Sequence, residues 1–150
     1  TEEPVSDVDL GQIATEVAVR FRRRSGRDIE LRVHEGGHDP VAARASMIER
    51  AVSNLVENAL KFSDAPTAVE IEVRRGRVDV LDRGIGVDDT DRARVFDRFY
   101  RADVARTRPG SGLGLAIVAQ IAALHGGSAR LAPRDGGGTV ATLDLAPPPR

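Results

Sequence analysis

The chain has 150 residues, of which 41% are hydrophobic and 30% charged, as expected for one globular domain. A net charge of -1 argues against electrostatic binding to nucleic acid or to an anionic membrane. The absence of Cys excludes disulfides and thiolate metal sites, and no apolar run reaches the length of a membrane span. We therefore predict one domain over residues 1–150, monomeric in isolation, with no nucleic-acid partner and no direct membrane contact.

The first predicted elements are a helix and a strand. Asp9 has the side chain of a helix N-cap, and the helix that follows runs to about Ser25, where Gly26 stops it. Residues 29–34 alternate between apolar and charged side chains, which predicts a half-buried strand.

A long helical pattern comes next, over residues about 42–62. Val69–Arg74 and Arg77–Asp82 then have the composition of two strands, joined by a short turn at Gly76. We expect these two strands to form an antiparallel hairpin.

The second half of the chain begins with a segment of a different kind. Residues from about 84 to 112 hold glycines, Pro109, several charges and one short predicted helix near 91–96, so we expect either a functional lid or a disordered insertion. A helix over about 113–125 and strands over about 128–132 and 139–145 follow, and residues 146–150 form a Pro-rich tail.

These elements together indicate the α+β class. Three main helices and about five strands, several of them in antiparallel hairpins, need one shared core to bury their apolar faces. We predict a two-layer sandwich in which a mixed, mostly antiparallel five-stranded sheet carries the helices on one face.

The basic residues are almost all Arg. Of the 22 Lys and Arg residues only Lys61 is Lys, and the only Asn residues are Asn54 and Asn58. All three fall within eight consecutive residues. In a chain that otherwise avoids Lys and Asn, this clustering indicates a site.

The three rare side chains share one face of the predicted helix. Spacings of four and three residues place Asn54, Asn58 and Lys61 on neighbouring turns, about 120° from the apolar stripe. The stripe contains Ile48, Val52, Leu55, Ala59 and Phe62. A solvated face is one interpretation. The alternative is a magnesium polyphosphate site, because an Asn carbonyl is a hard ligand for Mg²⁺ and a Lys ammonium binds phosphate.

Two glycine clusters have the composition of ligand-binding loops. Asp82 ends a strand and is followed by Gly84 and Gly86, an arrangement that lets a flat ligand approach the backbone, although glycines after a strand are commonly just a turn. Gly110, Gly112 and Gly114 open a helix whose N-terminus suits phosphate, although they can also be a simple hinge. Their spacing and context fit neither a Rossmann fingerprint nor a Walker A loop.

Four motifs in order resemble the ATP-binding domain of sensor histidine kinases, which is related to gyrase, the heat-shock 90 chaperone and mismatch-repair ATPases. Residues 54–62 resemble the N box, 82–86 the G1 box, 95–101 the F box and 110–115 the G2 box. The resemblance covers nearly the whole chain and implies the Bergerat fold, with ATP and Mg²⁺ as cofactors. The composition and the ending of the chain also resemble those of actinobacterial kinases.

The resemblance implies a role for each residue that matches a motif. Asn58 would ligate Mg²⁺, Asn54 and Lys61 would support the phosphates, and Asp82 would accept the adenine amino group. Further nucleotide contacts would come from Phe62, Gly84, Ile85, Gly86, Gly110, Gly112, Leu113, Gly114, Leu115 and Thr139. Arg98 and Arg101 of the lid would reach the γ-phosphate.

One position favours a kinase over a hydrolase. Hydrolytic relatives carry a Glu four residues before the metal-binding Asn, to activate water, and here that position is Asn54. Glu57 lies about 100° around the helix from Asn58 and is poorly placed to substitute. The alternatives are an ATP hydrolase, a stand-alone protein-serine kinase such as an anti-sigma factor, and a nucleotide sensor without catalysis.

The family's phosphoacceptor histidine has no match in this chain. His34 ends a strand and His125 ends a helix, and neither lies in the family's acceptor signature. We predict that the chain binds ATP but does not phosphorylate itself. The implied partners are the phosphoacceptor and dimerisation domain of the same kinase and a response regulator. The implied location is the cytoplasmic side of a membrane-bound sensor.

Overall fold

The computed structural model describes residues 3–64, 66–86, 96–97 and 114–145. Within these residues the helices are α1 (Leu10–Ser25), α2 (Ala45–Phe62) and α4 (Gly114–Leu124). The strands are β1 (Ser6–Asp9), β2 (Ile29–Val33), β3 (Pro40–Ala43), β4 (Val69–Arg74), β5 (Arg77–Asp82), β6 (Ser128–Pro133) and β7 (Thr139–Asp144).

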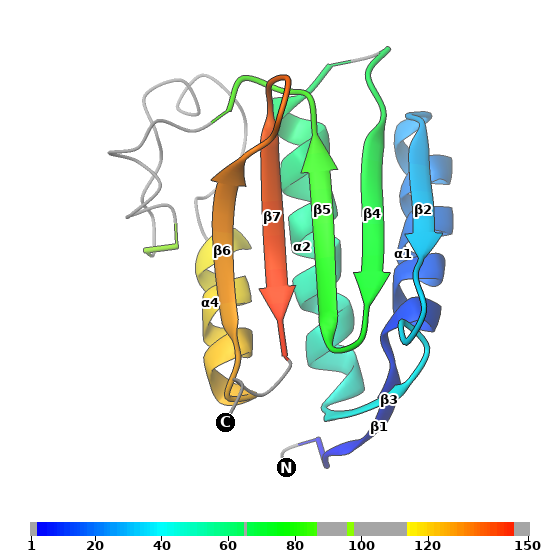
Figure 1. The fold of residues 1–150 in the computed structure, drawn as a ribbon, viewed down its shortest axis with the longest axis vertical. Helices are drawn as coiled ribbons and strands as arrows, with labels where there is room; N and C mark the ends of the chain where they lie inside the picture. Colours follow the sequence, from blue (N-terminus) through cyan, green and yellow to red (C-terminus); the bar gives the residue numbers. More distant parts are fainter. Residues whose placement is uncertain (1–2, 65, 87–95, 98–113, 146–150) are drawn as a thin grey trace.

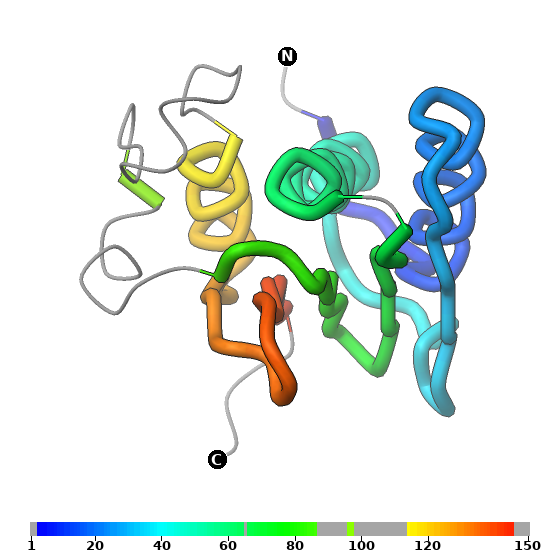
Figure 2. Tube along the Cα trace, turned by 90° about the horizontal axis from the view of Figure 1, so that it is seen from above, coloured from blue at the N-terminus to red at the C-terminus, as the bar shows by residue number. Residues whose placement is uncertain are grey.

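The main sheet has five strands in the order β2-β4-β5-β7-β6 (Figure 1). β2 and β4 are parallel and every other neighbouring pair is antiparallel. The three helices lie side by side on one face of the sheet, and the view from above shows the two layers (Figure 2). The predicted α+β sandwich with a mixed, mostly antiparallel sheet is therefore confirmed.

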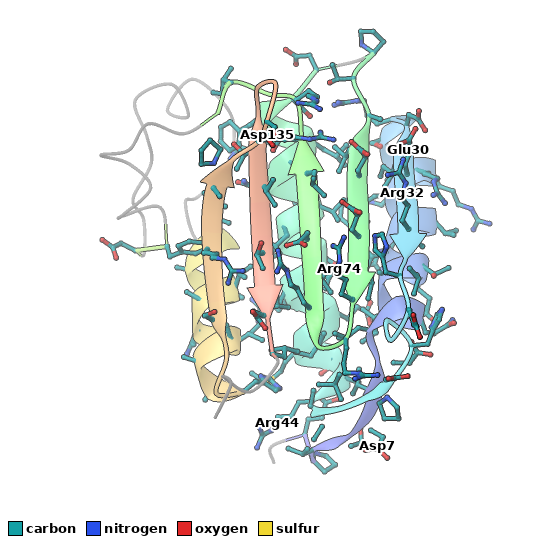
Figure 3. All side chains as sticks on the ribbon, in the orientation of Figure 1. Asp7, Glu30, Arg32, Arg44, Arg74 and Asp135 are labelled. Carbon is teal, nitrogen blue, oxygen red and sulfur yellow. The ribbon has the colours of Figure 1, made fainter. Side chains whose placement is uncertain are left out.

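The core lies between the two layers. Val69, Ile71 and Val73 alternate along β4 toward the helices, and all three are fully buried. The opposite face of the sheet carries charged side chains, among them Glu30, Arg32 and Arg74, which Figure 3 shows on the side away from the helices. This alternation is the period-two pattern of a sheet with one buried face.

α2 lies at the centre of the helical layer and packs against both α1 and α4. The predicted apolar stripe is buried at Ile48, Val52, Leu55 and Ala59, and Phe62 at the end of the helix is half-buried. The spacing of these residues puts them on one side of the helix, so the other side remains available for polar groups.

α1 begins and ends where the sequence predicts. The Asp9 side chain accepts a hydrogen bond from the Gln12 backbone N–H at 2.9 Å, and Gly26 ends the helix in the left-handed conformation with φ 68°. Both caps satisfy backbone groups that a helix end leaves unpaired.

α2 begins later than predicted. The structure also contains a small two-stranded sheet that the sequence patterns do not predict. The helical pattern suggested a start near residue 42, but Pro40–Ala43 is strand β3 and pairs with β1, with Val8 opposite Val41. The two strands are about thirty residues apart in sequence, so no local pattern reports their pairing. The predicted short helix near 91–96 falls almost entirely outside the described residues.

Candidate functional site

Asn54, Asn58 and Lys61 project from the face of α2 that the core leaves free. All three side chains are partly exposed, whereas the neighbouring stripe residues are buried. The Asn54 Nδ2 donates a hydrogen bond to the Gly114 carbonyl at 3.4 Å. The start of α4 therefore lies beside the polar stripe of α2, as the sequence motifs require for one site.

Lys61 lies at the C-terminal end of α2, next to Phe62. Its Nζ is 5.3 Å from the centroid of the Phe62 ring, within the range of a cation–π contact. The ammonium is thus held near the end of the helix, one turn beyond Asn58.

Asp82 ends β5 and is only 6% exposed. Burial raises the pKa of its carboxyl group, while hydrogen bonds from the backbone of Gly84 and Thr139, and then the positive charge of Arg134, act in the opposite direction. The Gly84 N–H donates to Asp82 Oδ1 at 2.8 Å. The carboxylate is therefore held in a fixed orientation by short-range donors.

Gly84 brings this loop into direct contact with the end of α2. A Cβ at Gly84 would lie 2.0 Å from the carbonyl oxygen of Phe62, so only glycine fits there. The next residue, Ile85, donates its N–H to the same Phe62 oxygen at 3.3 Å. Asp82 is in this way positioned beside the helix end that carries Lys61 and Phe62.

Strand β7 completes this side of the site. Thr139 pairs with Asp82 across the β5–β7 ladder. A Cβ at Gly138, which has φ 108°, would lie 2.0 Å from the Asp82 carbonyl oxygen. Residues 134–138 form the turn between β6 and β7, and the end of that turn packs against the backbone of Asp82.

The structure brings most of the predicted site residues that it describes to one end of the sheet. Ile85 is 53% exposed, an unusual position for a large apolar side chain, and Leu115 is half-buried against the core. Gly86 adopts φ 74°, which favours glycine. The remaining predicted residues lie outside the described part of the chain: Arg98, Arg101, Gly110, Gly112 and Leu113.

Two arginines that the sequence does not identify as site residues form contacts at this end of the sheet. Arg83 Nη1 donates to the carbonyls of Asp135 at 2.5 Å and Gly137 at 2.9 Å, and Arg134 forms an ion pair with Glu70. Arg83 lies between the two motif residues Asp82 and Gly84, and the sequence motif assigns it no role. Its partners are backbone carbonyls about fifty residues away, which no sequence signal identifies.

The donor set fits a magnesium ion that is bound mainly through a nucleotide. Among the described residues no group of three or more His, Cys, Asp or Glu side chains forms a metal cage. Mg²⁺ keeps several waters and takes few protein ligands when phosphates bind it, so one Asn oxygen on an open helix face is a suitable protein ligand. Asn58 has that chemistry and that placement.

Residues 43–149 match the family described as histidine kinase-, DNA gyrase B- and HSP90-like ATPase. The chain therefore belongs to this family, and its relatives place it among the ATP-binding catalytic domains of two-component sensor histidine kinases. It is 39% identical to the sensor-like histidine kinase SenX3 of Mycobacterium tuberculosis (strain ATCC 25618 / H37Rv) over 94% of this chain and 36% of SenX3. No helix in the described part of the chain is long and apolar enough to cross a membrane.

Two further kinases are similar in sequence or structure. The histidine-protein kinase/phosphatase MprB of Mycolicibacterium smegmatis is 43% identical over 87% of this chain and 27% of MprB. A solved structure of a mycobacterial MprB has a TM-score of 0.76 and 32% identity, over 92% of this chain and 94% of that one. Full-length ShkA in complex with AMPPNP has a TM-score of 0.78 and 29% identity, over 95% of this chain and 31% of ShkA.

The sensor PrrB, which the composition and chain ending suggest as a particular relative, is a structural neighbour only. The ATP-binding domain of PrrB from Mycobacterium tuberculosis has a TM-score of 0.72 and 28% identity, over 97% of this chain and 98% of that one. SenX3 and MprB are more similar in sequence, at 39% and 43% identity, so the family prediction is confirmed and the link to PrrB in particular is not.

Proposed function

We propose that this chain binds Mg–ATP and donates the γ-phosphate to a histidine on a separate phosphoacceptor and dimerisation domain of the same kinase. That domain would then pass the phosphate to a response regulator. The chain spans 36% of SenX3 and 27% of MprB, which leaves room in such proteins for an acceptor and for a membrane-anchored sensor. In this arrangement the chain works on the cytoplasmic side.

The observation that carries the proposal is the convergence of three segments on one end of the sheet. α2 presents Asn54, Asn58 and Lys61, and α4 begins beside Asn54. Asp82 is buried where β5 ends, next to the last residue of α2. A polyphosphate along α2 and a purine at Asp82 use these groups together.

The roles follow from the chemistry of each group. Asn58 would hold Mg²⁺, which when bound neutralises phosphate charge. Asn54 and Lys61 would orient the phosphates, and Asp82 would accept the adenine amino group while Gly84 and Gly86 let the ring approach. Arg98 and Arg101, together with the glycines at 110 and 112, would complete the phosphate contacts from the lid. Phosphoryl transfer depends mainly on such positioning and charge stabilisation.

The position of Asn54 favours transfer to a protein over hydrolysis. An amide has no basic group to activate water, and Asn54 uses its Nδ2 to donate to the Gly114 carbonyl. Glu57 is exposed and belongs to another side of the helix. No general base is therefore placed beside Asn58 on α2.

Nucleotide binding tests the site directly. We expect Asp82→Asn and Asn58→Ala each to weaken Mg²⁺-dependent binding of a fluorescent ATP analogue by about tenfold or more, which is about 1.4 kcal/mol. Glu57→Gln, one residue from Asn58, is the matched control and should bind like the wild type. If both site variants retained wild-type affinity, the placement of adenine and metal would be wrong.

Transfer of label tests the reaction. With ATP labelled at the γ-phosphate, the chain alone should acquire no stable label, and it should label a kinase fragment that carries the acceptor histidine. Stable label on the chain alone would contradict the proposal. Label on a serine of a partner would indicate the anti-sigma type of kinase, and steady release of phosphate would indicate a hydrolase.

A further inference from the structure

The turn between β6 and β7 is fastened to the strand end that carries Asp82. Arg83 follows Asp82 directly, and its Nη1 donates to the carbonyls of Asp135 at 2.5 Å and Gly137 at 2.9 Å. One guanidinium nitrogen thus joins two carbonyls of the turn. Asp135 is labelled in Figure 3 at the end of the sheet where β5 stops.

Arg134 fastens the other side of the same turn. Its backbone N–H closes the turn on the Gly138 carbonyl at 3.0 Å. Its side chain forms an ion pair with Glu70 of β4 and is only 10% exposed. Because β5 and β7 separate β6 from β4, the Arg134 side chain reaches across two strands. The turn is therefore held from β5 and from β4.

The position of this turn determines the surroundings of the Asp82 carboxylate. Gly138 packs so closely on the Asp82 carbonyl that a Cβ would lie 2.0 Å from it. Thr139, the next residue, is paired with Asp82 in the ladder. A shift of the turn would move both neighbours of Asp82. Displacements of about 1 Å in a positioning group are large enough to weaken recognition strongly.

We propose that Arg83 is a positioning residue for adenine recognition: it fixes the β6–β7 turn, with Arg134 as the second anchor, and so holds Asp82 in the orientation that selects the adenine amino group. This inference rests on the proposed function, in which Asp82 receives that amino group. Arg83 itself does not touch the nucleotide. It acts through residues 135–139.

A purely stabilising role for Arg83 would have a different effect on base discrimination. Arg83 is exposed, and hydrogen bonds between an exposed side chain and backbone carbonyls contribute little net stability. If stability were the only role, removing Arg83 would leave the discrimination between bases unchanged. A positioning role changes base discrimination in the fully folded protein.

Selectivity between ATP and inosine triphosphate measures base discrimination, since inosine lacks the exocyclic amino group. We expect Arg83→Ala to reduce the preference for ATP by about tenfold, with little change in the affinity for inosine triphosphate. Arg83→Lys, which keeps a cationic donor, should recover most of the preference. Arg130→Ala is the matched control, because Arg130 lies on β6 and pairs with Asp144 at 3.7 Å, away from the turn.

The outcomes separate this inference from the proposed function. If Asp82→Asn kept the full preference for ATP, adenine would not be recognised at Asp82 and the proposed site would fail. If Asp82→Asn lost the preference but Arg83→Ala and Arg134→Gln both kept it, the site would stand and the positioning role would be overturned. Equal weakening of both nucleotides by Arg83→Ala would also overturn it.

Discussion

At Asp82, the burial of a charged carboxylate favours the proposed ligand binding but lowers the stability of the fold. It is 6% exposed, and its burial raises the pKa of the carboxyl group despite the donors from Gly84 and Thr139. Burying a carboxylate costs stability in its charged form, because the charge loses its contact with water. At the same site the full negative charge makes Asp82 a strong acceptor for an amino group.

The raised pKa of Asp82 predicts the sign of a pH effect on stability. The folded state keeps the Asp82 proton to a higher pH than the unfolded chain, whose Asp titrates near pH 3.9. Asp82 therefore lowers the free energy of unfolding as the pH rises from about 4 through its raised folded-state pKa. We expect Asp82→Asn to gain stability relative to wild type across that range, measured by urea unfolding at several pH values. A difference that is constant, or that shrinks as the pH rises, would contradict this.

At the scale of elements, an arginine from another loop caps the end of α2. Arg27 Nη1 donates to the carbonyls of Leu60 at 3.3 Å and Ser63 at 3.0 Å, and its Nη2 donates to Ser63 Oγ and the Thr67 carbonyl, both at 3.1 Å. The last carbonyls of a helix lack partners within the helix, and a cation at that end is favourable. Arg27 thereby holds the helix end that carries Lys61.

Replacing this cap by an apolar side chain of similar length should destabilise the fold. We expect Arg27→Met to lower the free energy of unfolding by about 2–3 kcal/mol, because several partly buried carbonyls lose their donors. Arg75→Met is the matched control: Arg75 is 75% exposed and pairs with Asp39 on the surface, so a loss of less than about 1 kcal/mol is expected. Equal losses in urea unfolding would show that Arg27 acts only as a surface charge.

At the scale of the whole molecule, three distant parts of the chain meet at the start of α2. The Glu3 carboxylate accepts from the Ser46 backbone N–H at 3.1 Å and from the Ser46 hydroxyl at 2.7 Å, and Arg44 Nε donates to the Glu3 carbonyl at 2.9 Å. The Arg44 backbone N–H donates to His125 Nε2 at 3.1 Å, just beyond the end of α4. The N-terminal residues are thus tied to the start of α2, and the start of α2 is tied to the residue that follows α4.

Glu3 supplies the cap that α2 lacks at its own N-cap residue, Arg44. The Ser46 hydrogen bonds lower the pKa of Glu3, so its contribution is present above the ordinary value near 4.3 and is lost as the pH falls through the lowered one. We expect Glu3→Gln to melt at a lower temperature than wild type at pH 7, with the two Tm values converging below about pH 4. A gap in Tm that did not change with pH would contradict the role of the charge.

Much of the fold was predictable because its signals are local. The Asp9 cap, the Gly26 stop and the Gly76 turn each depend on neighbouring residues, and the two strands of the β4–β5 hairpin have the predicted bounds. The start of α2 was not predictable in this way, because the pairing of β3 with β1 is a long-range interaction that competes with helix propensity at residues 42–44.

The sequence by itself determined the composition of the site: the rare Asn and Lys residues on one helix face, and the acidic residue and glycines after a strand. The roles of these residues as ligands stay predictions. Only the tertiary structure decided which groups surround Asp82, since the Phe62 carbonyl comes from the end of α2, whereas the Gly138 backbone belongs to the distant β6–β7 turn that Arg83 holds. The physical reason is that motifs report chemistry and local spacing, whereas close packing between distant segments is decided by the fold as a whole.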